Sequence, residues 1–117
     1  MNNKEKGLMG EKIAQSYLKK QGYKIIQTNY RASKFAEIDI VAKHKDVLVF
    51  VEVKMRFSTV NGFGREAVTK EKQKHIRFAA THYITTKIKK EIPARFDVLE
   101  ITFSDEIPEI ELIQNAF

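Results

Sequence analysis

A carboxylate and an amine stand two residues apart in the segment VFVEVKMR, residues 49–56. The alternation of side chains predicts a β-strand, whose period of two puts Glu52 and Lys54 on one face. The segment AEIDIVA, residues 36–42, alternates in the same way and carries Asp39. Carboxylates beside a lysine can bind a divalent cation and position a water molecule, so these three side chains are the first candidates for a site.

The polar sequence KHKD joins the two segments and predicts an antiparallel hairpin. A connection with an even number of residues would put Asp39 on the face of Glu52 and Lys54. It would also leave Ile38 and Ile40 on a wholly apolar face. An odd number would bury acids among valines, which is costly because buried charges need partners. We therefore expect the even register.

Carboxylates held together repel one another, which raises a pKa unless a positive charge compensates. Mg²⁺ with oxygen ligands supplies that charge, and a period of 100° per residue places Glu11 at the edge of the first helix's apolar stripe, within reach. With Lys54 orienting or deprotonating a water molecule, the set predicts phosphodiester hydrolysis. The alternative is a solvated sheet face with ordinary cross-strand ion pairs.

Seven elements are expected to position these residues, in the order α-β-β-β-α-β-β. The first helix covers residues 10–22, with Lys4 as an alternative start, and the second runs from the N-cap Thr69 through about Thr86. Strands are expected at 23–32, 36–42, 47–56, 95–103 and 110–117. This order predicts an α+β or mixed α/β domain in which helices pack on one sheet.

The 117 residues predict a single domain over residues 1–117 with a core of its own. There is no cysteine, which excludes disulfides, zinc–cysteine sites and thiol nucleophiles. No apolar run reaches about 18 residues, so we expect no signal peptide, no membrane span and a cytoplasmic protein. The net charge of +6 favours a polyanionic partner such as nucleic acid.

The start of the second helix is basic and could bind phosphate groups, with a solvated helix face as the alternative. Arg56 and the glycine loop at Gly62 and Gly64 could clamp a nucleic acid strand, or form a plain connector. A structural salt bridge is expected for Asp97. The candidate nucleic-acid contacts are Arg56, Lys70, Lys72, Lys74 and Arg77.

In order and spacing, the blocks GEKIAQSYLKKQGY, TNYR, EIDIVA, VFVEVKMR, AVTKEKQKHI and RFDVLEI resemble the YraN-type family of small bacterial proteins. The family looks like a branch of the PD-(D/E)xK nuclease superfamily, close to archaeal Holliday-junction resolvases. The resemblance implies that superfamily's restriction-endonuclease-like αβββαβ core, with one mixed sheet flanked by helices.

The resemblance also implies a catalytic set in which the acids hold Mg²⁺ or Mn²⁺ and the polar residues lie beside the metal. Ile38 stands where the superfamily has proline, and Ala36 where the family usually has glycine, but neither position is a ligand. The catalytic set is Glu11, Asp39, Glu52, Lys54 and Gln73, of which Glu11, Asp39 and Glu52 are the metal ligands. For Gln73 the alternative is a residue that satisfies its own hydrogen bonds at the boundary of the helix.

These observations lead to three hypotheses. The first is a metal-dependent endonuclease-like protein acting on DNA, with branched or damaged DNA among the candidate substrates. The second is a nucleic-acid-binding module that keeps the fold but cleaves nothing. The third, a protein-interaction domain, fits the net charge of +6 less well. The sequence leaves both a monomer and a homodimer open.

Overall fold

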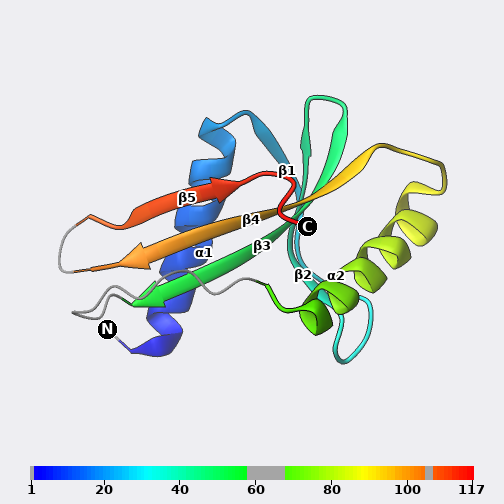
Figure 1. Cartoon of the computed structure of the whole chain (residues 1–117). Helices are drawn as coiled ribbons and strands as arrows, with labels where there is room; N and C mark the ends of the chain where they lie inside the picture. Colours follow the sequence, from blue (N-terminus) through cyan, green and yellow to red (C-terminus); the bar gives the residue numbers. More distant parts are fainter. Residues whose placement is uncertain (1, 58–67, 105–106) are drawn as a thin grey trace.

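The computed structural model describes residues 2–57, 68–104 and 107–117. Within them the chain forms two α-helices, a π-helical segment and five strands (Figure 1). In chain order these are α1 (Asn3–Lys20), β1 (Tyr23–Arg31), β2 (Glu37–His44), β3 (Val47–Phe57), α2 (Lys70–Tyr83), η1 (Ile84–Ile88), β4 (Ala94–Phe103) and β5 (Glu109–Ile113).

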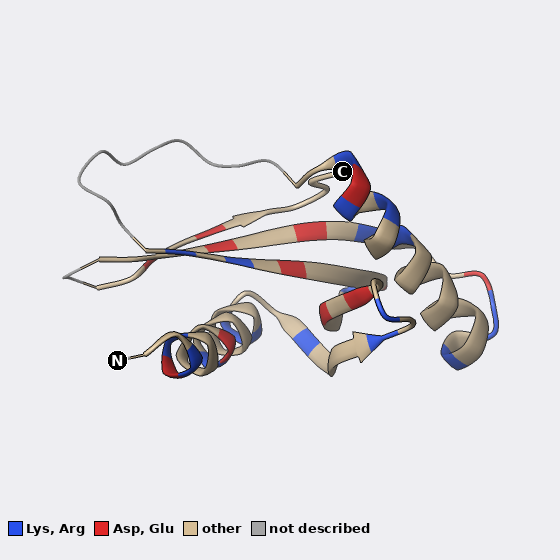
Figure 2. Ribbon diagram, turned by 90° about the horizontal axis from the view of Figure 1, so that it is seen from below, with Lys and Arg blue, Asp and Glu red and all other residues tan. Residues whose placement is uncertain are grey.

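The strands of the described residues form one mixed sheet in the order β1-β2-β3-β4-β5. β3 and β4 are parallel, and the other neighbours are antiparallel. A parallel pair needs a crossover, which α2 provides. α1 and α2 lie on opposite faces of the sheet (Figure 2). The predicted mixed α+β class and the αβββαβ core are confirmed, and no helix in the described ranges is long and apolar enough to cross a membrane.

The helix ends follow local signals in the sequence. Thr69 caps α2 as predicted, since its hydroxyl accepts a hydrogen bond from the Lys72 N–H at 3.1 Å. Gly22 follows α1 with φ 90°, a conformation that glycine adopts without strain. Helix one starts at Asn3, next to the alternative start at Lys4 and earlier than Gly10, because the side chain of Asn2 caps the helix by accepting from the Glu5 N–H. The α-helical part of helix two ends earlier than predicted, at Tyr83, and the π-helical segment η1 begins at the next residue.

The hairpin between β2 and β3 has the predicted even register. His44 pairs with Val47 across a two-residue turn, and pairing continues to Ile40 opposite Val51. Ile40 packs under α1 with Val51, as expected. Ile38 does not, and instead joins the cluster under α2. Before Ile40, β2 pairs with β1 but not with β3. Because β3 no longer holds this part of the strand, Ile38 faces α2.

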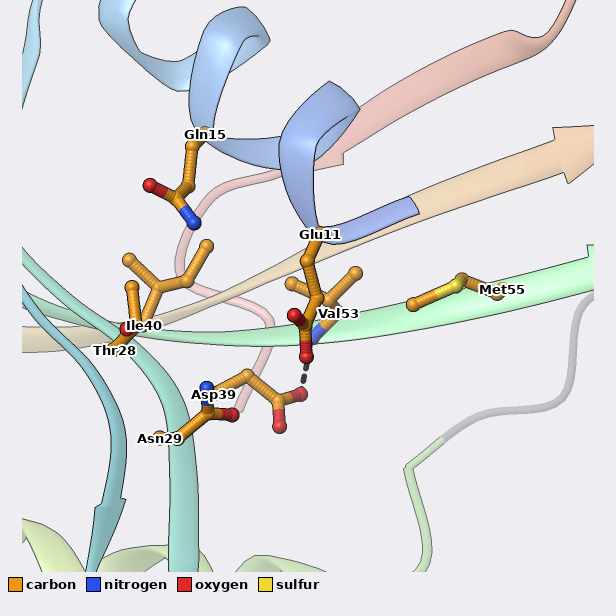
Figure 3. A pocket seen from close by; sticks show the side chains of 8 residues that line it. All are labelled: Glu11, Gln15, Thr28, Asn29, Asp39, Ile40, Val53 and Met55. Atoms are coloured by element: carbon orange, nitrogen blue, oxygen red, sulfur yellow. Dashed lines mark hydrogen bonds between the residues drawn. The ribbon is translucent and has the colours of Figure 1, made fainter. Parts of the chain in front are cut away.

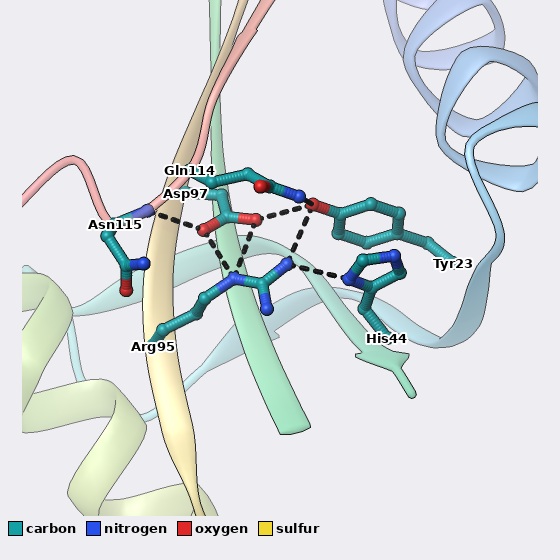
Figure 4. Close-up of polar contacts among 6 residues, drawn as sticks. All are labelled: Tyr23, His44, Arg95, Asp97, Gln114 and Asn115. Carbon is teal, nitrogen blue, oxygen red and sulfur yellow. Dashed lines mark hydrogen bonds and ion pairs between the residues drawn. The ribbon is translucent and has the colours of Figure 1, made fainter. Parts of the chain in front are cut away.

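A buried polar network closes the end of the sheet where β3 and β4 begin (Figure 4). Asp97 is fully buried and accepts hydrogen bonds from the Tyr23 hydroxyl at 2.7 Å and from Arg95 Nε at 3.0 Å. The predicted salt bridge of Asp97 is therefore confirmed. The backbone N–H of Asn115 also donates to Asp97, at 3.1 Å. The last strand thus ends at Ile113, earlier than predicted, and the following residues fold back onto this carboxylate.

Candidate active site

The site begins where β2 and β3 separate. Beyond Ile40 the ladder has no further backbone pairs, and the side chain of Asp39 fills the gap. Its Oδ2 accepts a hydrogen bond from the Val53 N–H at 2.8 Å. Because the strands diverge here, the Asp39 carboxylate can be reached both from the α1 side of the sheet and from the α2 side. The sequence predicted this residue on one face with Glu52 and Lys54, within reach of Glu11 on the first helix.

Glu52, the next acidic residue of the site, hydrogen-bonds through its carboxyl group to that of Asp39. Burial, followed by the neighbouring negative charge of Asp39, raises the pKa of Glu52 to about 8. The pKa of Asp39 is also raised, chiefly by burial, although the hydrogen bond from Val53 opposes the rise. Two carboxyl groups in contact cannot both ionise cheaply, so the pair holds a shared proton near neutral pH.

Lysines from two elements approach this pair. The Lys72 ammonium, on α2, lies 4.0 Å from Glu52 Oε2. The charge of Lys54, two residues along β3, also lowers the pKa of Glu52. Lys54 stands opposite Glu100 on β4, a buried carboxylate whose Oε1 is 3.7 Å from Arg56 Nη2. The basic and acidic residues therefore continue across the sheet from β3 to β4.

Glu11 lines the same pocket as Asp39, but it belongs to α1, which lies on the face of the sheet opposite to α2. α1 carries it above the separated strands, with its side chain directed toward Asp39 (Figure 3). The pocket also contains polar side chains whose sequence pattern predicts no role in the site. One of them, Asn29, has φ 53°, a left-handed conformation that asparagine tolerates better than most residues. The lining residues are Glu11, Gln15, Thr28, Asn29, Asp39, Ile40, Val53 and Met55.

A divalent cation fits the chemistry of these donors. Mg²⁺ is commonly held by one or two carboxylates, with water molecules and phosphate oxygens completing its shell. Asp39 and Glu52 provide two carboxyl groups in contact, and their repulsion is what a cation would remove. Within the part of the chain that the structure describes, no three histidine or acidic side chains are gathered closely enough to hold an ion together. Glu11 would thus contribute from the pocket wall, apart from the two carboxyl groups that are in contact.

The remaining predicted residues are spread over α2 and its surroundings. Gln73 is half-buried and donates through Nε2 to the Val68 carbonyl at 2.9 Å, so it braces the start of α2. Lys70 and Lys74 are exposed. The Arg77 guanidinium stacks over an aromatic ring, that of Phe96, at 4.9 Å. The predicted clamp at Gly62 and Gly64 lies outside the described residues.

Comparison with known proteins places the chain in a family. The sequence model of the uncharacterised protein family UPF0102 matches residues 10–101. The chain belongs to the UPF0102 family. It is 42% identical over 119 residues to a UPF0102 protein of Caldicellulosiruptor saccharolyticus and 45% identical over 117 residues to one of Clostridioides difficile, with 100% of each chain covered in both cases. A UPF0102 protein of Geobacter metallireducens is 44% identical over all of this chain and 95% of its own length.

The matched UPF0102 segment contains the whole candidate site. Glu11 stands next to its first residue and Glu100 next to its last. The segment ends before β5 and before Asn115, which completes the Asp97 network.

Proposed function

We propose that this protein hydrolyses phosphodiester bonds in DNA with a divalent cation, Mg²⁺ or Mn²⁺. One observation carries the proposal: the carboxyl groups of Asp39 and Glu52 are in hydrogen-bond contact beside Lys54 and Lys72. A carboxyl pair in contact is electrostatically costly, and a structural role alone would be served by a neutral pair. Sites that bind a cation and a phosphate together need such a mixture of acids and lysines.

Each residue has a role in this proposal. Asp39 and Glu52 would hold the cation, and Glu11 would contribute its carboxylate from the pocket wall. When bound, the cation neutralises charge on the phosphate and lowers the pKa of a water molecule. Lys54 donates hydrogen bonds that orient the attacking water. Lys72 is paired with Glu52 in the structure and, once that carboxylate has another partner, can contact a phosphate oxygen instead.

A cleavage assay tests the proposal. The protein is incubated with Mg²⁺ or Mn²⁺ and labelled single-stranded, duplex, flap and four-way DNA, beside Glu52→Gln and Lys54→Ala. Glu109→Gln is the matched control, because Glu109 is an exposed acid on the same sheet. We expect metal-dependent cuts that both site variants lose by about 100-fold or more and the control retains. Cleavage that survives Glu52→Gln, or calorimetry that detects no binding of either cation, would contradict the proposal.

A second candidate function is DNA binding without cleavage. It is favoured by the Lys72–Glu52 ion pair, which already compensates part of the acidic charge. This alternative predicts binding that weakens steeply with salt, with no cuts in any cation and no effect of Glu52→Gln on affinity.

A further inference from the structure

The turn between β1 and β2 presents an aromatic ring to solvent beside the candidate active site. Phe35 is 69% exposed, although phenylalanine is usually buried. Its ring stacks on the imidazole of His75 on α2, with centroids 6.2 Å apart and planes inclined by 26°. Figure 1 shows this turn, in cyan, beside the first turns of α2. Two elements from different parts of the chain thus build one aromatic surface.

The backbone of the turn holds this ring in place. The Ala32 N–H donates to the Ala36 carbonyl at 2.8 Å, and the Ala36 N–H donates to the Ser33 carbonyl at 3.3 Å. Ala36 itself is buried in the core under α2. The exposed ring is therefore carried by a closed, anchored turn, which reduces the entropy lost when a ligand stacks on it.

The aromatic surface adjoins the acidic pair through α2. His75 lies three residues after Lys72, so the two side chains occupy neighbouring positions on one helix face, about 5 Å apart along the axis. Lys72 in turn reaches Glu52 at 4.0 Å. From the other direction, Phe35 precedes Asp39 by four residues on the chain that enters β2. The ring is therefore connected to the carboxyl pair both through α2 and through the start of β2.

The charges around the ring are mixed, with lysines outnumbering the acids Glu37 and Glu71. The Lys34 ammonium lies 5.6 Å from the centroid of the Phe35 ring, and Lys70 and Lys74 are exposed on the first turns of α2. In Figure 2 the ribbon at this end of the helix is coloured mostly for Lys and Arg, with one acidic position between them. An apolar protein partner would gain nothing from these lysines. An aromatic ring flanked by lysines is instead the arrangement that binds single-stranded nucleic acid, since bases stack on the ring and phosphates contact the charges.

We propose that Phe35 and His75 form a stacking platform for an unpaired nucleotide of DNA. A base inside a duplex is already stacked on both faces, whereas an unpaired base has a free face to offer, so the platform selects DNA with a single-stranded segment. This inference deepens the proposed function, and rests on it for the position of the cleaved phosphate. The substrate class it names is DNA with a gap, flap or single-stranded end next to the site.

A fluorescence titration tests the platform directly. The chain contains no tryptophan, so Phe35→Trp introduces a single fluorophore at the platform. The titrants are an oligothymidylate of about 12 nucleotides and a blunt duplex of the same length, in a chelator and low salt so that nothing is cleaved. Phe57→Trp is the matched control, because Phe57 is 44% exposed, stacked on Phe103 and covered by Lys6, but lies on the α1 side of the sheet.

We expect the oligothymidylate to quench emission of Phe35→Trp and the duplex to leave it unchanged, with no quenching of Phe57→Trp. Phe35→Ala should weaken binding of the oligothymidylate about tenfold or more, and Phe35→Tyr should keep it near the wild-type value. Absence of quenching, or equal quenching by the duplex, would overturn the inference. So would an emission change that follows protein concentration alone, since that would assign the ring to contact with a second copy of the chain.

Failure of the platform and failure of the proposed function give different results. Quenching by single strands without cleavage under any condition would leave the platform standing and refute hydrolysis. Metal-dependent cleavage that Phe35→Ala leaves unchanged, on single-stranded and duplex substrates alike, would support hydrolysis and refute the platform.

Discussion

The carboxylate of Asp39 accepts a hydrogen bond from the backbone N–H of Val53, with 2.8 Å between Oδ2 and N, at the point where β2 and β3 stop pairing. Within a continuous ladder, that N–H would be satisfied by the backbone of the neighbouring strand. The side chain therefore replaces a missing backbone partner. The group that we propose as a metal ligand also closes the opening in the sheet, so its two roles can be separated by substitution.

Asp39→Ala should lower the free energy of unfolding by about 1–3 kcal/mol, because it leaves the Val53 N–H without its acceptor. Asp39→Asn retains an oxygen that can accept this bond, so it should lose less stability while losing the charge needed for a cation. Urea unfolding measures both variants. Glu37→Ala is the control, since the ion pair of Glu37 with Arg31 is solvent-exposed and its loss should change stability by less than about 0.5 kcal/mol. Equal losses in Asp39→Ala and Asp39→Asn would show that the hydrogen bond is not the cause.

The stability of the protein should fall as the pH rises through the neutral range. The pKa of Glu52 is about 8 in the folded chain and 4.5 as the ordinary value, so between these limits the folded state binds more protons than the unfolded state. The free energy of unfolding then decreases with pH, on the order of 4 kcal/mol between pH 4.5 and 8. Denaturant titrations across this range should show the decline in the wild type. In Glu52→Gln, which cannot ionise, this contribution should be absent, and a decline of equal size there would assign the effect to other groups.

Divalent cations should reverse this decline. A cation that binds the ionised carboxyl pair stabilises the folded state and displaces the shared proton. At pH 7, calorimetric titration with Mg²⁺ or Mn²⁺ should therefore release protons, measured as a difference in heat between two buffers of unlike ionisation enthalpy. Glu52→Gln should remove the release, and Glu109→Gln should preserve it. Cation binding without proton release would place the ion elsewhere.

The Asp97 network should be among the most sensitive parts of the fold. Asp97→Ala removes the partner of Arg95 and an acceptor of the Tyr23 hydroxyl, so we expect a loss of about 3–5 kcal/mol. Tyr23→Phe deletes one donor to a charged group and should cost about 1.5–3 kcal/mol. Thermal unfolding of both variants checks the order. If Asp97→Ala behaves like a surface substitution, with a change below about 0.5 kcal/mol, the network does not hold the end of the sheet.

The hairpin could be predicted from the sequence because two local constraints agree on it. A period of two defines the faces of each strand, and the cost of burying acids among valines leaves a single register. That register brings Asp39 and Glu52 together. Thr69 and Gly22 were equally predictable, because capping depends on residues next to each other in the chain.

The separation of the strands could not be predicted in the same way. Ile38 follows the alternation of β2, yet it packs under α2, because β2 pairs with β3 only from Ile40 onward. The pairing of Lys72 with Glu52 depends on where α2 docks, and the local sequence showed only a basic helix start. Asn29 and Gln15 enter the pocket through the packing of α1 on β1, which no periodicity within either segment encodes.

The close approach of α1 to β3 should depend on Gly10. A Cβ atom at this position would lie 2.2 Å from Met55 Sδ, so Gly10→Ala must displace either Met55 or the helix. Gly7 is the matched control, because a Cβ there meets nothing within 4 Å. Gly7→Ala should stabilise the protein by about 0.5–1 kcal/mol through helix propensity alone, whereas Gly10→Ala should give no gain or a loss.

A substitution at Gly10 should also affect the site, because the next residue of α1 is Glu11. A displaced helix moves this carboxylate away from Asp39, so Gly10→Ala should weaken Mg²⁺ binding in calorimetry while Gly7→Ala leaves it unchanged. Met55→Ala removes the obstructing side chain, and the double variant with Gly10→Ala should recover the affinity if the clash is the cause. An unaltered affinity in Gly10→Ala would mean that Met55 yields instead of the helix, or that Glu11 takes no part in holding the cation. The same measurement on Glu11→Gln decides between these two outcomes.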